Sequence, residues 1–290
     1  MEPPLKPNES DCCNSGCNPC ILDVYEDQLK KYLNQEPNRS HATNCISETA
    51  YTTFRLVGIE AHAQNTFIYT FEHINASNNL HLFYKPGQHF LIKAPRNGTY
   101  FTRAYTPIPT EKINHLTFTI LIKLYKDGAM SNFFRKLKAN DDTLWRGPYG
   151  DYNINYNLGH MLLIAQGTGI APLYAIIHKI IQNENCETFL HLFLCCKKED
   201  DIPLRNELYR LSSYWNFSYE IFLSQATDVK CKYNETVHIF RLSSNNIKSY
   251  FNNISVDNNQ ILICGSEMFN KDISQAVLDC NVDSTKIVPF

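Results

Sequence analysis

The chain has 290 residues, enough for two compact domains, with 43% hydrophobic and 19% charged residues. Its formal net charge of -2 gives no electrostatic reason to expect a nucleic-acid partner. No apolar run approaches the ~20 residues of a membrane-spanning helix, and the N-terminus resembles neither a secretory signal nor a transit peptide. We therefore expect a cytoplasmic protein whose 11 cysteines are free thiols or metal ligands.

The first region, residues 1–40, is a small Cys-rich segment followed by a short helix. Its four cysteines fall within nine positions: Cys12, Cys13, Cys17 and Cys20. Four thiolates at this spacing can bind zinc or an iron–sulfur cluster, and a Cys-x-x-Cys pair can also act as a redox dithiol. Apolar residues at helical spacing predict a helix over Ile21–Leu33, which is too small to form a core alone.

The second region, residues 49–150, shows short strands separated by turn residues. We expect strands at 53–60, 66–72, 89–95, 116–125 and 143–148, with one helix over 130–140. Many short strands with few helices favour an antiparallel β-barrel.

The third region, residues 159–290, alternates strands with helices after a polar linker. Strands are expected at 160–166, 188–196, 218–223 and 260–265, and helices at 171–183, 204–215, 245–253 and 267–280. Strand–helix alternation predicts a doubly wound α/β domain with a parallel sheet.

The stretch "RAYTPI" in the second region has the chemistry of a ligand site. Alternation on a strand places Arg103 and Tyr105 on one face and Thr106 on the other. A cation and an aromatic ring side by side suit a ligand that carries both negative charge and a flat ring.

The third region opens with a strand, the turn "GTGIAP" and a helix. Gly167 and Gly169 permit a tight turn and close approach of a ligand, and Pro172 fits the first helical turn. The helix N-terminus offers free amide donors to an anion. A Gly-x-Gly turn alone is equally compatible with a plain tight connection.

A second candidate lies at the end of the strand 260–265, where Cys264 and Gly265 occupy the carboxyl edge at which open α/β sheets bind ligands. Cys264 is suited to packing against a nicotinamide ring, or it is simply a buried apolar residue. Phe290 is either a free end or a lid over a ring-shaped ligand.

Together these motifs resemble NADH–cytochrome b5 reductase and its ferredoxin-reductase-like relatives. The resemblance runs from about Thr49 to Phe290 and rests on eight features in family order: "PGQHF", "RAYTP", "IKLY", "GAMS", "RGPYG", "GTGIAP", "CGSEM" and a terminal Phe. It implies an FAD-binding antiparallel β-barrel of the ferredoxin-reductase type followed by an NAD-binding α/β domain.

The resemblance also implies roles for residues of the barrel. Arg103 would pair with the FAD pyrophosphate, Tyr105 would lie against the flavin and ribityl chain, and Thr106 would hydrogen-bond the reactive edge of the ring. The other residues implied at the FAD site are Ala104, Ile122, Lys123, Tyr125, Gly128, Ala129, Met130 and Ser131.

For the nucleotide domain, the resemblance implies that Thr168 touches both flavin and nicotinamide. Gly167 and Gly169, with Cys264, Gly265, Met268 and Phe290, would form the rest of the NADH site. Many NADH-selective members carry an acid where this chain has Gln225, so the choice between NADH and NADPH stays open.

The implied activity is hydride transfer from NADH to FAD across the cleft between the domains, followed by single-electron transfer to an acceptor such as cytochrome b5. Thr106, Lys123 and Cys264 are the residues implied at the reacting centre. Lys93, Arg135, Lys136 and Lys138 either dock an acidic acceptor or form an ordinary solvated face. The first 40 residues resemble the oxidoreductase-like N-terminal module.

Two other functions fit the sequence. One is an NAD(P)H-dependent reductase of another acceptor, such as ferric iron or a quinone. The other is a scaffold that keeps the reductase fold without turnover, in which case Ala129, Ala171 and Gln225 would mark lost contacts.

Overall fold

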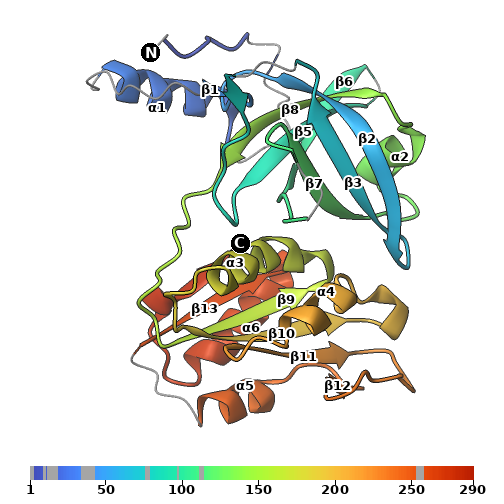
Figure 1. The fold of residues 1–290 in the computed structure, drawn as a ribbon, viewed down its shortest axis with the longest axis vertical. Coiled ribbons are helices and arrows are strands. Elements are labelled where there is room, and N and C mark those ends of the chain that lie inside the picture. The colour runs from blue at the N-terminus through green and yellow to red at the C-terminus, as the bar shows by residue number, and fades with distance from the viewer. Residues whose placement is uncertain are drawn as a thin grey trace. The chain divides into compact units, whose positions relative to one another are not determined.

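The computed structural model describes residues 3–8, 11, 19–33, 43–75, 79–96, 98–110, 114–252 and 258–290. The chain divides into two compact units (Figure 1). The barrel unit comprises Met1–Ala61 and Phe67–Tyr152, and the α/β unit comprises His62–Thr66 and Asn153–Phe290.

The barrel unit is built on a six-stranded antiparallel sheet with the strand order β6-β5-β8-β2-β3-β7. Its strands are β2 (Thr52–Ala63), β3 (Thr66–His73), β5 (His89–Arg96), β6 (Thr99–Tyr105), β7 (Thr117–Lys123) and β8 (Asp142–Tyr149). The chain beyond β6 returns to the far edge of the sheet, because Pro107 bridges Ile120 and the Ile108 amide donates to the Thr119 carbonyl at 2.8 Å. The ends of the sheet therefore meet, and the sheet closes into the predicted barrel.

Aromatic side chains fill this barrel. Trp145 is fully buried, and its ring meets those of Phe71 and Phe118 with centroids 5.0 Å apart in both pairs. Edge-to-face contacts of this kind stabilise a core beyond the area that they bury. Helix α2 (Ala129–Lys136) packs on the barrel through the buried Phe134.

The N-terminal segment packs against the outer surface of the same barrel. Helix α1 (Ile21–Leu33) has the predicted bounds, and its first residue is fully buried. The Arg146 guanidinium of β8 donates to the Pro19 carbonyl at 3.4 Å, and the Gln28 amide donates to Glu48 at 2.6 Å. This short helix is thus stabilised by docking on the barrel. Nearby, β1 (Thr43–Asn44) and β4 (Leu80–His81) pair in parallel.

The α/β unit contains a six-stranded parallel sheet with the order β12-β11-β10-β9-β13-β14. The strands are β9 (His160–Gln166), β10 (Phe189–Cys196), β11 (Phe217–Leu223), β12 (Thr236–His238), β13 (Asn259–Cys264) and β14 (Ile287–Pro289). The helices are α3 (Ile170–Ile181), α4 (Arg205–Leu211), α5 (Ser244–Phe251) and α6 (Glu267–Leu278).

Helices cover both faces of this sheet, as Figure 1 shows. Ile247 of α5 and Val277 of α6 belong to one buried cluster with Phe193 of β10. The strand order reverses at β9, whose neighbours are β10 on one side and β13 on the other. In an open parallel sheet, ligands bind beyond the carboxyl ends of the strands at such a switch point. The fold therefore directs attention to the loops that follow β9 and β13.

Several details differ from the expectations. Helix α4 ends at Leu211 instead of continuing to Trp215, since the hydroxyls of Ser212 and Ser213 each donate at 2.8 Å to a carbonyl three residues back. The strands β12 and β14, of three residues each, had not been expected. In the part of the chain that the structure describes, no helix is long and apolar enough to cross a membrane.

Candidate active site

The turn after β9 is shaped for close approach of a ligand. Gly167, Thr168 and Gly169 form a short 3-10 turn, and Gly167 has a φ of 54°, a conformation that costs other residues about 1–2 kcal/mol. A β-carbon on Gly167 would meet nothing within 4 Å, so its open side is accessible. Helix α3 starts directly afterwards without an acidic residue in its first turn. This end of α3 can accept an anion.

The loop after β13 packs directly against that turn. A β-carbon on Gly169 would lie 2.8 Å from the carbonyl carbon of Cys264, and one on Gly265 would lie 2.9 Å from the β-carbon of Gln166. The Ser266 amide donates to the Gln166 side-chain oxygen at 3.1 Å. Both glycines are therefore needed to bring the two loops together. Gln166, which the motifs did not single out, fixes their spacing.

Ser266 gives the loop after β13 a defined structure. Its hydroxyl accepts from the Phe269 amide at 3.3 Å and caps α6. Met268 lies exposed in the first turn of this helix. Burial raises the pKa of the Cys264 thiol to about 12, so this side chain is a neutral thiol at physiological pH. It can pack against a ring but is not a nucleophile.

Phe290 is held next to the same strand by its backbone. Its amide donates to the Ile263 carbonyl at 2.8 Å, and its carbonyl accepts from the Asn270 side chain at 3.1 Å. The structure thus places the residues predicted at the nucleotide site, Gly167 to Gly169, Cys264, Gly265 and Phe290, around the ends of β9 and β13.

In the barrel unit, register supports the predicted alternation along β6. Arg103 pairs with Ile92 and Tyr105 with Phe90, so both share one face of the sheet, while Ala104 pairs with Leu91 on the other face. The exposed Arg103 donates to the Thr102 carbonyl at 2.8 Å. The Tyr105 ring packs edge-on against Phe134, with centroids 5.4 Å apart. Burial, the largest influence, raises the pKa of Tyr105 well above its ordinary value, so the phenol stays neutral.

The end of β7 and the start of α2 form one unit of structure. The Tyr125 amide donates to the Ser131 hydroxyl at 2.9 Å, and a β-carbon on Gly128 would crowd that hydroxyl at 2.8 Å. The Arg135 guanidinium donates to the Tyr125 carbonyl at 2.8 Å. Among the described residues no side chain caps the α2 N-terminus, so the amides at Ala129, Met130 and Ser131 face a site that favours an anion.

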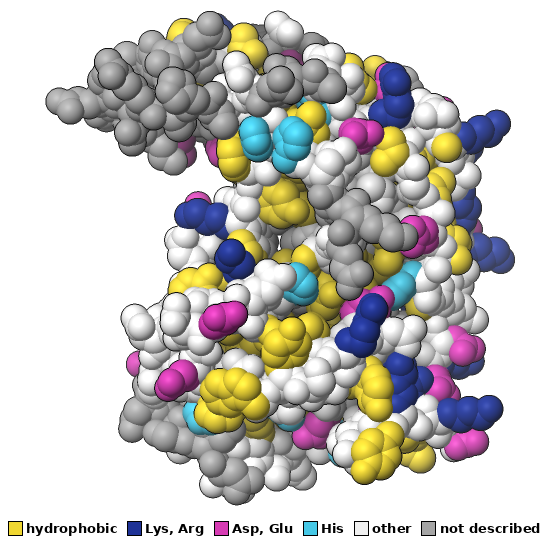
Figure 2. Space-filling view, viewed as in Figure 1, with side chains coloured by type: hydrophobic (Ala, Val, Ile, Leu, Met, Phe, Trp, Pro, Cys, Tyr) yellow, Lys and Arg dark blue, Asp and Glu magenta, His cyan; other side chains and the backbone are white. Residues whose placement is uncertain are grey.

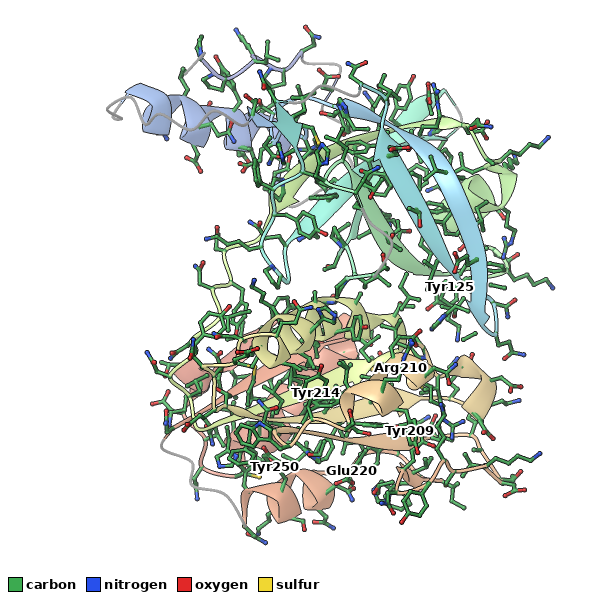
Figure 3. The ribbon with its side chains drawn as sticks, viewed as in Figure 1. Tyr125, Tyr209, Arg210, Tyr214, Glu220 and Tyr250 are labelled. Carbon is green, nitrogen blue, oxygen red and sulfur yellow. The ribbon has the colours of Figure 1, made fainter. Side chains whose placement is uncertain are left out.

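Two further residues predicted at the flavin edge lie on segments that meet where the barrel closes. Thr106 follows β6 and Lys123 ends β7, and the Pro107–Ile120 bridge joins these segments. Ile122 is buried in the barrel core, whereas Tyr125, labelled in Figure 3, is 61% exposed. Ile122 can therefore contribute only backbone to a ligand, and Tyr125 has its ring available.

Among the proposed docking cations, Lys93 proves to be engaged within the barrel unit. Its side chain is 11% exposed, lies 3.5 Å from Asp11, and sits over the rings of Tyr51 and Tyr100. The prediction of an open docking role for Lys93 is therefore wrong. Arg135, Lys136 and Lys138 are exposed as expected.

The predicted metal ligands Cys12, Cys13 and Cys17 lie outside the described residues. Cys20 is described and carries a free thiol. Within the described ranges, no group of three or more His, Cys, Asp or Glu side chains is arranged to hold a metal ion.

The residues present fit both implied cofactors. A dinucleotide needs donors and positive charge for its phosphates, and Arg103 with the uncapped α2 supplies both in the barrel unit. In the α/β unit, the open side of Gly167 and the first turn of α3 provide the same chemistry for a pyridine nucleotide.

Comparison with known families agrees with this geometry. Residues 53–154 match the oxidoreductase FAD-binding domain, 163–275 the oxidoreductase NAD-binding domain, and 1–41 the N-terminal oxidoreductase-like protein family. The barrel and α/β units together thus define an FAD- and NAD-binding oxidoreductase of the ferredoxin-reductase fold.

Relatives and solved structures narrow the class. The chain is 31% identical to the human NADH-cytochrome b5 reductase-like protein, covering 95% of this chain and 90% of the relative, and 28% identical to the mouse protein, covering 96% and 92%. The cytochrome b5 reductase domain of Ulva prolifera nitrate reductase has the same fold, with a TM-score of 0.72 at 17% identity, covering 86% of this chain and 100% of that one. The chain belongs to the NADH–cytochrome b5 reductase-like family.

Proposed function

We propose that this protein is an NADH-dependent flavoprotein reductase that passes electrons to an acceptor protein of the cytochrome b5 type. The observation that carries the proposal is the packing of the glycine turn, at Gly169, against Cys264 at the switch point of the parallel sheet. The names of its relatives supply the acceptor class. FAD, when bound, accepts a hydride from reduced nicotinamide and releases electrons one at a time.

In the barrel unit, Arg103 and the α2 N-terminus would bind the FAD pyrophosphate. Arginine presents a planar fork of donors that matches two phosphate oxygens, and the amides of Ala129 to Ser131 add neutral donors. Tyr105 would pack along the ring system, with Ala104, Ile122, Tyr125 and Gly128 completing the surface. The N-terminus of α2 supports this role because, in the described part of the chain, no side chain caps it.

The α/β unit would bind NADH at the ends of β9 and β13. Gly167 and Gly169 admit the nucleotide to the backbone, while Gly265, Met268 and Phe290 line its nicotinamide end. The neutral Cys264 thiol would pack against the ring without competing for the hydride. Thr106, Lys123 and Cys264 would act by orientation, since hydride transfer depends on alignment more than on an acid or base.

The acceptor would dock by charge. Arg135 and Lys136 lie in the last turn of α2, and Lys138 follows it, so three cations lie within four positions on an exposed surface. An acidic protein surface is the complementary partner. The rival acceptors, ferric iron and a quinone, require no such patch.

The test uses the purified full-length protein. We expect a flavin spectrum that bleaches anaerobically with NADH and regains its colour when oxidised cytochrome b5 is added. Turnover with ferricyanide or a quinone, but not with cytochrome b5, would favour a reductase of ferric iron or a quinone. Protein that refuses added FAD would show a scaffold instead.

The N-terminal cysteines form a separate part of the proposal. Cys12, Cys13, Cys17 and Cys20 would together bind zinc or an iron–sulfur cluster, with Cys20 near the docked start of α1. Metal analysis of the intact protein should give one stoichiometric metal or cluster that disappears in a variant with all four changed to serine. The absence of stoichiometric metal from the anaerobically purified protein would contradict this.

We further propose three functional regions, residues 1–40, 49–150 and 159–290, and a cytoplasmic location. The eight described cysteines are free thiols, which fits a reducing compartment. Fractionation of cells producing the protein would test the location.

A further inference from the structure

A cavity of about 200 Å³ opens at the amino ends of β9, β10 and β11. His160 is the first residue of β9, and Phe189 is the first residue of β10. The glycine turn and Cys264 follow the opposite, carboxyl ends of the sheet. A strand of seven residues spans about 20 Å, so this cavity is separate from the proposed nucleotide site.

Aromatic rings form the walls of the cavity. Trp215 is 67% exposed and Phe189 is 46% exposed, and their rings meet edge to face with centroids 5.3 Å apart. His160 stacks on Phe189 at 5.4 Å. Figure 2 shows hydrophobic side chains reaching the surface of this unit among charged ones. Two large rings held at right angles in water offer a corner into which a third flat ring can pack.

Polar groups converge on the floor. His191 of β10 faces Ser218 of β11 in the sheet register, and the His191 Nδ1 and the Ser218 hydroxyl lie 2.7 Å apart. Tyr250 of α5 stacks on the His191 ring at 5.1 Å. Figure 3 labels Tyr250 and, on β11, Glu220. The imidazole is therefore held in place from both sides.

A carboxylate, that of Glu220, lies beside the His191 ring. Its two oxygens lie 2.6 Å from the Nε2 of His238 and 3.4 Å from the Nε2 of His191. The second separation is an ion-pair distance without hydrogen-bond geometry. The two imidazoles, His191 first, lower the pKa of Glu220 despite the opposing effect of burial, so the carboxylate is ionised near neutrality. A carboxylate only accepts, so the His238 Nε2 donates to it.

Ser218 supplies an acceptor for a ligand. Its hydroxyl oxygen has two lone pairs, and the hydrogen bond with the His191 Nδ1 uses at most one of them. The Ser218 oxygen therefore keeps a lone pair as an acceptor at the exposed end of β11. The cavity thus combines aromatic walls with one acceptor on its floor.

We propose that this cavity is a second ligand site, which binds a single-ring aromatic compound carrying an O–H or N–H donor. Size limits the ligand to one ring, because a cavity of about 150 Å³ accommodates benzene whereas sites for larger ligands measure about 300–1,000 Å³. The ring packs against Trp215 and Phe189, and its donor group hydrogen-bonds to Ser218. The argument is independent of the proposed reductase activity.

The test titrates the ¹⁵N-labelled full-length protein with phenol and follows indole N–H resonances by NMR. The chain has two tryptophans, and Trp145 is fully buried, so the Trp215 signal reports the cavity and the Trp145 signal serves as an internal control. We expect a saturable shift of the Trp215 signal with phenol and weaker binding of toluene, which lacks the donor. Cyclohexanol, which lacks the ring, should not bind.

Three variants sharpen the result. Ser218→Ala should weaken phenol binding about 2- to 10-fold, the usual value of one hydrogen bond, without changing toluene binding. Ser218→Thr should retain phenol, and Ser224→Ala, the same change at the other end of β11, should have no effect. A shift that rises linearly with phenol, or equal affinity for phenol and toluene in the unmodified protein, would overturn the proposal. Unchanged phenol affinity in a folded Ser218→Ala protein would do the same.

Discussion

The backbone of Gly169 lies so close to Cys264 that a β-carbon on residue 169 would stand 2.8 Å from the Cys264 carbonyl carbon. The contact joins the turn after β9 to the end of β13, two segments almost 100 residues apart in sequence. Neither partner in this contact can yield easily, because Cys264 is backbone of the parallel sheet and Gly169 is backbone of the tight turn between β9 and α3. Gly169 is therefore required for space, whereas Gly167 is required for its positive φ.

Replacement of this glycine gives the first prediction. Gly169→Ala should lower the free energy of unfolding by about 1–3 kcal/mol, the usual cost of overpacking, by separating the two loops. The resulting separation of the two loops should reduce kcat/KM for NADH about 10- to 100-fold. FAD content should not change, because the substitution lies in the other unit.

Gly58→Ala is the matched control, since its β-carbon would make an ordinary 3.5 Å contact with Thr70 in β3. Urea unfolding and steady-state kinetics with ferricyanide measure both effects. Normal NADH kinetics in Gly169→Ala would show that the loop contact does not shape the nucleotide site.

A second prediction concerns Arg103. Arg103→Ala should weaken FAD binding about 10- to 100-fold, as expected for loss of charge-assisted hydrogen bonds to phosphate. The FAD affinity of Arg103→Lys should fall between those of the unmodified protein and Arg103→Ala, because an ammonium keeps the charge but cannot form the planar fork. The measurement is the fluorescence titration of apoprotein with FAD. Arg96→Ala, an exposed cation at the end of β5, is the control, and equal losses in both variants would count against a specific phosphate contact.

Cofactor preference provides a third prediction. Gln225 is exposed just beyond β11. Its backbone N–H donates at 2.8 Å to the backbone carbonyl of Lys197, which is also exposed. Gln225→Glu should place a negative charge where an adenosine 2′-phosphate would bind and raise the NADH-to-NADPH ratio of kcat/KM about 3- to 10-fold, a range that allows for solvent screening. Gln182→Glu, at the end of α3, serves as the control. An unchanged ratio would place the adenosine ribose elsewhere.

A fourth prediction concerns stability and pH in the α/β unit. The side chain of Glu235 is fully buried and accepts from Arg205 Nε at 2.9 Å, Tyr219 Oη at 3.0 Å and the Lys232 amide at 3.0 Å. Burial alone would raise the pKa of Glu235, but these donors together hold it below its ordinary value. Glu235→Gln should cost about 2–3 kcal/mol at pH 7, less than a fully broken buried pair, because Arg205 keeps Glu199 at 2.7 Å.

The pH dependence follows from the lowered pKa. The stabilisation from Glu235 is complete above the unfolded-state pKa of about 4.3 and is lost as the pH falls through the lower folded-state value. The difference between wild type and Glu235→Gln in urea unfolding should therefore shrink below about pH 4. Glu184→Gln, an exposed site, is the control. A constant difference down to pH 3 would mean that packing, rather than charge, explains the loss.

Much of the fold could be predicted because its signals are local. The bounds of α1 follow from helical spacing, and the alternation of strands and helices gave the order of the α/β unit. The three-residue strands β12 and β14 escaped notice because such short segments show no periodicity. Helix α4 was predicted too long, since nothing in the spacing reveals that Ser212 and Ser213 bond backwards and end it.

The sites divide in the same way. Gly167, Gly169 and Arg103 stand in recognisable motifs, but the Gln166–Ser266 hydrogen bond joins residues 100 positions apart. The aromatic cavity was invisible for the same reason, because His191 and Ser218 meet only through strand register. The engagement of Lys93 by Asp11 also depends on docking between distant segments.

The seating of the N-terminal segment has a practical consequence for anyone who works with parts of this protein. The guanidinium of Arg146 donates to Pro19, and the ammonium of Lys93 donates to Asp11, both of which precede α1. Ile21, the first residue of α1, is fully buried. A shortened chain that begins at the FAD-binding region would lack these partners. Its barrel would then expose two cations without these acceptors and the apolar surface that Ile21 covers. Such a fragment should aggregate sooner on storage than the whole polypeptide.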